Sequence, residues 1–111
     1  MKHMMTHQEV EEYILSMPNA RLEYPFGESV AVYKVGDHMF ALISEGKEPV
    51  NVSLKCDPQL SQVLREKYET VMPGYHLNKK HWNTVVLTGQ LPREEVEALI
   101  RHSYNLVTGV H

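Results

Sequence analysis

The 111-residue chain has the length of one compact domain, and we expect a single domain over residues 1–111. Hydrophobic residues make up 42% and charged residues 23%, close to the averages of globular proteins, which excludes a fibrous or disordered chain. The net charge of -3 and the pI near 6.1 give no general attraction to nucleic acid or anionic lipid, so such binding requires a local basic patch.

The single cysteine and the hydropathy pattern indicate a compartment. Cys56 has no partner for an intramolecular disulfide, which suits a reducing cytosol. No apolar run approaches the ~20 residues of a membrane span, and the start MKHMMTHQEVEEY turns acidic where a signal peptide turns hydrophobic. We therefore expect a cytoplasmic protein that does not associate with membranes.

Local signals predict three helices. N-caps and prolines mark their starts: Thr6 with Glu9, Asp57 with Pro58, and Pro92. The first helix should stop at Pro18-Asn19 and the second near Tyr68. In the second helix, the apolar spacing predicts that Leu60, Val63 and Leu64 face inward.

Runs of β-branched and aromatic residues predict strands at 29–35, 38–44, 50–55 and 83–89. Gly36-Asp37 suits the positive φ angles of a tight hairpin between the first two. The order α-β-β-β-α-β(β)-α, with the segment around residues 68–78 as the optional strand, predicts a two-layer α+β domain with antiparallel pairing.

The turn Tyr24-Pro25-Phe26-Gly27 precedes the first long strand. We expect a rigid turn in which Phe26 fills the core. In the alternative, this turn lies beside the later loop and widens a shared surface.

The segment PGYHLNKKHWNTVVL, residues 73–87, is the candidate binding surface. No acidic residue lies between Glu69 and Glu94, while lysines can contact phosphates and rings can stack on bases. Asn83 offers further hydrogen bonds. The candidate nucleic-acid contacts are Tyr75, His76, Asn78, Lys79, Lys80, His81, Trp82 and Arg93.

Other interpretations of these residues remain open. Tyr75 and Trp82 could pack against the sheet while the lysines keep a loop soluble. The spacing of His76 and His81 fits no metal motif, and Cys56 has no sequence signature of a catalytic thiol, so we expect no metal, no cofactor and no catalytic residue.

The chain resembles the MmcQ/YjbR family. The resemblance covers MPNARLEYPFG, VYKVGDHMFALI, VNVSLKCDP, PGYHLNKKHWNTV and SYNLV. It implies an α+β fold likened to secretion chaperones and CyaY, with helices on one side of an antiparallel sheet. It also implies DNA binding through a double-wing arrangement of strands and loops.

Three functions follow as hypotheses. The first is a non-enzymatic DNA-binding protein that contacts phosphates weakly and in a salt-sensitive way through Lys79 and Lys80. The alternative is a protein-interaction or adaptor domain that receives a peptide or subunit on the loop and an exposed sheet face. The third is a small-molecule binder or enzyme with His76 and His81 as acid-base groups. We expect a monomer.

Overall fold

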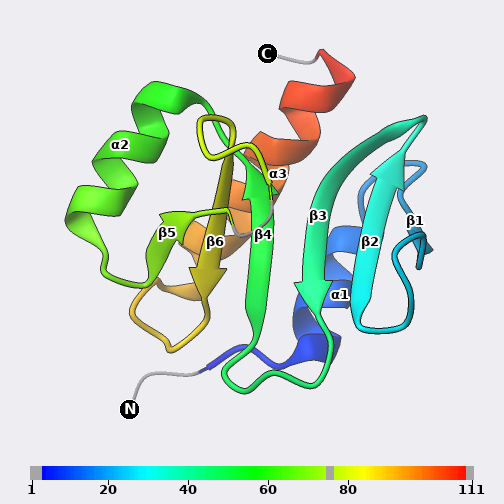
Figure 1. Cartoon of the computed structure of the whole chain (residues 1–111), viewed down its shortest axis with the longest axis horizontal. Coiled ribbons are helices and arrows are strands. Elements are labelled where there is room, and N and C mark those ends of the chain that lie inside the picture. The colour runs from blue at the N-terminus through cyan, green and yellow to red at the C-terminus, as the bar shows by residue number, and fades with distance from the viewer. Residues whose placement is uncertain (1–3, 75–76, 110–111) are drawn as a thin grey trace.

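The computed structural model describes residues 4–74 and 77–109. It has a six-stranded antiparallel sheet with helices on one side (Figure 1). The elements in chain order are α1 (His7–Leu15), β1 (Arg21–Glu23), β2 (Val30–Val35), β3 (His38–Ser44), β4 (Asn51–Lys55), α2 (Pro58–Lys67), β5 (Val71–Pro73), β6 (Trp82–Val86) and α3 (Arg93–Thr108). The predicted α+β architecture is confirmed, and the short edge strand β1 is added within an expected link.

The strands lie in the order β1-β2-β3-β4-β6-β5, and every neighbouring pair is antiparallel. The hairpin between β2 and β3 forms at the predicted dipeptide, where Gly36 has a φ of 59°, a left-handed conformation that glycine adopts without steric cost. The predicted caps also form. Thr6 and Glu9 make a reciprocal capping box, and the Asp57 side chain accepts bonds from the first turn of α2.

The main core lies between the sheet and the helices. Alternate residues of a strand share one face, so Val52 of β4, with its neighbours Ile43 and Val85, points toward the helices. Val10 and Ile14 of α1 and Ile100 of α3 pack against this face, and α2 adds Leu64. Within the described residues, no helix is long and apolar enough to cross a membrane.

Strands β3 and β4 pair directly at only part of their length. Their ladder runs from Ile43 and Val52 to Ala41 and Leu54, and the next position is bridged by Ser103 of α3. The Ser103 hydroxyl accepts a hydrogen bond from the Lys55 amide at 2.9 Å and donates one to the Phe40 carbonyl. Ser103 is fully buried, so its hydroxyl replaces a strand-to-strand bond in the interior.

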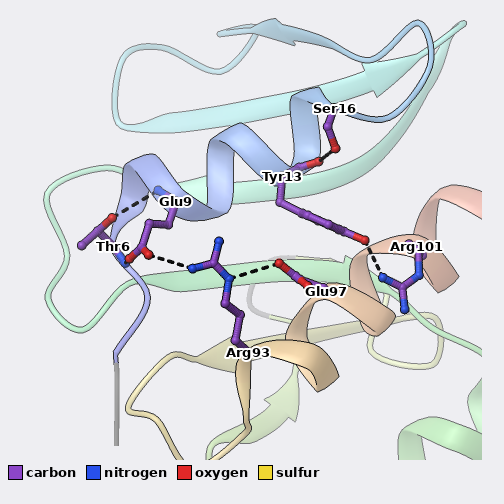
Figure 2. A network of polar contacts seen from close by, with 7 residues as sticks. All are labelled: Thr6, Glu9, Tyr13, Ser16, Arg93, Glu97 and Arg101. Carbon is purple, nitrogen blue, oxygen red and sulfur yellow. Dashed lines mark hydrogen bonds and ion pairs between the residues drawn. The ribbon is translucent and has the colours of Figure 1, made fainter.

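A polar network ties α1 to α3 (Figure 2). The Arg93 guanidinium donates to Glu9 at 2.9 Å and to Glu97 at 3.1 Å, while Arg101 donates to the Tyr13 hydroxyl. The hydrogen bond that Arg93 donates to Glu97 and the negative charge of Glu9 raise the pKa of Arg93. Helices α1 and α3 are therefore joined by polar contacts as well as by apolar packing.

Two sequence predictions about packing are wrong. Val63 does not face inward; its residue is 58% exposed, because α2 turns Ser61 and Leu64 toward the sheet instead. Phe26 does not fill the core either, since it is 63% exposed in the connection between β1 and β2. The alternative position of Phe26, beside the later loop, is taken up below.

Replacing Ser103 with alanine should lower the free energy of unfolding by about 1–3 kcal/mol, because the Lys55 amide and Phe40 carbonyl lose their buried partner. Chemical denaturation measures this change. The control is Ser16→Ala, which removes an exposed hydroxyl bonded to the Tyr13 carbonyl and should change stability by only about 0.5 kcal/mol. Equal effects of the two substitutions would contradict the bridging role of Ser103.

Candidate functional site

Short backbone contacts hold together the two ends of the connection between β5 and β6. Gly74 donates its amide to the Trp82 carbonyl at 2.9 Å, and a Cβ on Gly74 would lie 2.8 Å from the Cβ of Trp82, so only glycine fits. The Asn78 carbonyl accepts the Trp82 amide at 2.9 Å, and the Asn78 side chain accepts the Lys80 amide at 2.9 Å. Asn78 is thus engaged in shaping this loop.

Arg65 of α2 fixes the same loop from outside. Its guanidinium donates to the Asn83 side-chain oxygen at 2.8 Å, to the Trp82 carbonyl at 3.2 Å and to the Lys79 carbonyl. Asn83 is 2% exposed, and its amide nitrogen donates to Ser61 at 3.2 Å. The expectation that Asn83 reaches a ligand is therefore wrong, and sequence reasoning missed Arg65, whose partners are distant in the chain.

The remaining residues predicted to contact nucleic acid differ in how exposed they are. Lys79 and Lys80 are exposed, and His81 is half-buried with its carbonyl accepting the Cys56 amide at 2.8 Å. Tyr75 and His76 lie outside the described residues. The lysines are therefore available to a partner on a loop whose backbone is held in place.

Trp82 and Arg93 do not join the two lysines on the surface. Trp82 is 7% exposed and packs on Val32 and Leu42, so its ring has no open face for stacking. Arg93 follows the far end of β6 and is paired with Glu9 and Glu97 in the helix layer. The basic surface predicted from the sequence thus contracts to the loop itself.

Cys56 is buried at the end of β4, 3% exposed. Burial raises the pKa of its thiol, with the Ser61 hydroxyl acting in the opposite direction. A thiol of raised pKa is a poor nucleophile at neutral pH, which agrees with a structural role. Within the described residues, no cluster of His, Cys, Asp or Glu side chains could hold a metal ion.

A concavity with a volume of about 630 Å³ lies on the sheet face opposite the helices. We call it the open-face groove. Its lining residues are Phe26, Val30, Leu42, Ser44, Lys47, Asn51, Ser53, Met72, Pro73, Leu77, Thr84 and Val86. Phe26 and Leu77 line it together, so the turn before β2 and the β5–β6 loop do share one surface, as the alternative for Phe26 stated.

The groove is apolar on two sides and polar between them. Phe26, Val30 and Leu42 lie on the β2–β3 side, whereas Met72, Pro73, Leu77 and Val86 lie on the β5–β6 side. The middle holds small polar side chains, including the Ser53 and Thr84 hydroxyls at 2.9 Å from each other. Sequence reasoning missed this groove, although the alternation of Asn51, Ser53 and Lys55 already marked a face that is not core.

Comparison with known proteins relates the chain to one family. The YjbR family model matches residues 15–106. The chain is 37% identical over 100 residues to the protein YjbR of Escherichia coli K12, covering 90% of this chain and 85% of that protein. It is likewise 37% identical over 101 residues to YbdF of Escherichia coli O157:H7, covering 91% of this chain and 83% of that protein.

Solved structures share the fold. The crystal structure of Deinococcus radiodurans protein DR2400 superimposes with a TM-score of 0.90 at 39% identity, covering 95% of this chain and 80% of that one. A crystal structure of a Pseudomonas syringae protein gives a TM-score of 0.78 at 30% identity, covering 92% and 98% of the two chains. These proteins share the sheet on which the groove lies.

Replacing Arg65 with alanine should loosen the β5–β6 loop, because three acceptors each lose one hydrogen bond. We expect hydrogen exchange at the His81 and Trp82 amides to rise at least about tenfold. Lys67→Ala, which removes the nearby ammonium that lies 5.3 Å from the Tyr68 ring centre, should leave these amides unchanged. Exchange that is unaltered in Arg65→Ala would show that the loop holds itself.

Proposed function

The chain belongs to the YjbR family, and we propose that it is a non-enzymatic protein-interaction domain that receives an extended segment of a partner protein in the open-face groove. The observation that carries the proposal is the groove itself, an apolar concavity on the sheet face that the helices leave uncovered. The sequence-based adaptor hypothesis named the loop and an exposed sheet face, and this proposal keeps the sheet face as the binding surface.

Exposed apolar side chains at the groove support this proposal. Phe26 is 63% and Met72 40% exposed, although both residues lie among apolar neighbours that could bury them. Contiguous exposed apolar surface on a protein marks a place where another molecule binds, because its burial releases water at little cost. A partner segment that fills the groove removes both residues from water.

The ionisable groups of the groove favour binding over catalysis. Among the described residues that line it, Lys47 is the one that carries a charge, and the others are apolar, hydroxyl or amide side chains. General acid-base catalysis uses titratable groups placed within reach of the reacting atoms.

A second candidate is DNA binding through the β5–β6 loop, and one observation favours it. Lys79 and Lys80 are both exposed on a backbone fixed by Arg65 and Asn78, so two ammonium groups stand ready for phosphates. The buried Trp82 and the paired Arg93 add nothing to that contact. Binding of this kind would be weak and salt-sensitive.

The groove can be tested with a random peptide library displayed on phage. Met72→Glu places a charge in the groove wall on an exposed edge strand, so the fold should persist while enrichment of groove ligands falls at least about tenfold. Val63→Glu makes the same change at a 58% exposed site on α2 and should enrich the same peptides as the unmodified protein. Peptides enriched equally on Met72→Glu, or no enrichment on any of the three proteins, would contradict the proposal.

The loop candidate has its own test, the fluorescence anisotropy of labelled duplex DNA at low and physiological salt. If the lysines contact phosphates, the Lys79→Ala/Lys80→Ala protein should bind more weakly, and its dependence of log affinity on log salt should be shallower by about two. The control Lys67→Ala removes a lysine on α2, outside the loop, and should leave both quantities nearly unchanged. DNA affinity that is independent of Lys79 and Lys80 would exclude this candidate.

A further inference from the structure

The register of the strands fixes the spacing of the two apolar sides of the groove. Val30 pairs with Ser44, and Asn51 pairs with Val86, so these side chains form one row across β2, β3, β4 and β6. Leu42, Ser53, Thr84 and Met72 form the adjacent row. Each row begins and ends on an apolar side chain and has small polar groups between.

The distance between the two apolar sides determines which residues of an extended ligand can reach both. Three strand intervals separate β2 from β6, which amounts to roughly 14 Å at ~4.8 Å per interval. In an extended chain, side chains on the same face are two residues apart, and four residues span roughly 13 Å at ~3.3 Å each. An extended segment that crosses the strands therefore reaches both apolar sides with residues i and i+4, while residue i+2 faces the hydroxyls of the middle.

The residue at i+2 has a restricted chemistry. Ser44, Asn51 and Ser53 offer hydrogen-bonding groups there, and a large apolar side chain would remove these groups from water without offering them a hydrogen bond. A serine, threonine or asparagine can exchange bonds with the pair formed by Ser53 and Thr84. The groove thus selects a small polar residue between two large apolar ones.

The charges around the open face indicate which charge the residues that flank the bound segment should carry. Among residues 4–74 and 77–109, no carboxylate pairs with Lys47 on the rim, with Lys55 beside Trp82, or with Lys79 and Lys80 on the loop. The helices on the other side carry Glu9, Glu11, Glu12, Glu94, Glu95 and Glu97. A chain of net charge -3 therefore presents unpaired cations on the groove side, which attract a segment with carboxylates.

We propose that the occupant of the groove is an extended, acid-flanked segment of another protein, with large apolar residues at i and i+4 and a small polar residue at i+2. The proposal rests on the proposed function and adds a ligand specificity to it. Glu48 follows Lys47 in the chain but does not line the groove, so Lys47 provides the cation at that rim.

Fluorescence anisotropy of labelled synthetic peptides tests the spacing. The reference peptide is Asp-Asp-Leu-Thr-Ser-Thr-Leu-Asp-Asp, whose β-branched threonines disfavour a helix. Rearranged peptides of the same composition place the two leucines two, three or five residues apart. We expect the reference to bind at least about tenfold more tightly than each of these, since only it buries both leucines. Its binding should be lost in Met72→Glu and kept in Val63→Glu.

The flanks are tested by replacing the four aspartates with lysines. We expect that peptide to bind the unmodified protein more weakly than the reference, and Lys47→Glu to reduce or reverse the difference. If binding does not depend on leucine spacing but is abolished by Met72→Glu, the proposed specificity is wrong and the proposed function is retained. If no peptide binds in a Met72-dependent way, or if the protein dimerises through Met72 and a second copy fills the groove, both fail.

Discussion

The shape of this domain depends on the hydroxyl of Ser103. Strands β3 and β4 stop pairing beyond Ala41 and Leu54, and Ser103 completes the ladder by bonding the Lys55 amide and the Phe40 carbonyl. A buried backbone group without a partner is costly, so separation of the strands is stable only because α3 supplies this group. The ring of His102, the residue before Ser103, accepts the Asp57 amide at 3.1 Å and so adds a second contact between α3 and the end of β4. One helix therefore holds the two halves of the sheet.

This arrangement gives the two faces of the sheet different roles. All three helices contribute to the core on one face, whereas on the other face the described buried residues form the small cluster of Val32, Leu42 and Trp82. Trp82 reaches from β6 across to β3 and covers part of the open face, and the remainder is the groove. The β5–β6 loop supports both, because it carries Leu77 in the groove wall and is itself held by Arg65. The proposed binding surface thus lies on one side of a sheet whose other side is packed against the helices.

Local chemistry made most of the fold predictable from the sequence. The caps at Thr6 and Asp57, the turn at Gly36 and the alternation of Val50 to Lys55 each depend on neighbours within a few residues, and the structure confirms each of them. The position of Phe26 was not predictable in this way. An aromatic residue after proline reads as core, and only the placement of the helices reveals that its side of the sheet is uncovered.

The candidate site was harder to predict for the same reason. A basic, aromatic stretch at residues 77–82 is visible in the sequence, but burial of Trp82 depends on β3, which is distant in the chain. Pairing of Arg93 with Glu9 depends on α1, and the hold of Arg65 on the loop depends on α2 lying beside β5 and β6. β2 and β3 are apolar on both faces, so their pattern does not say which face the helices take. These features depend on packing between segments that are distant in the chain, which local sequence patterns do not predict.

The most direct measurement is a two-dimensional amide NMR map of the protein with a peptide selected from the library. The proposal predicts that the shifted amides lie on β2, β3, β4 and β6 around Val30, Leu42, Ser53 and Thr84, and that peptide protons show contacts to the Phe26 ring and the Met72 methyl group. Shifts confined to the helix layer of α1 and α3, or to Lys79 and Lys80 alone, would contradict a binding site on the open face.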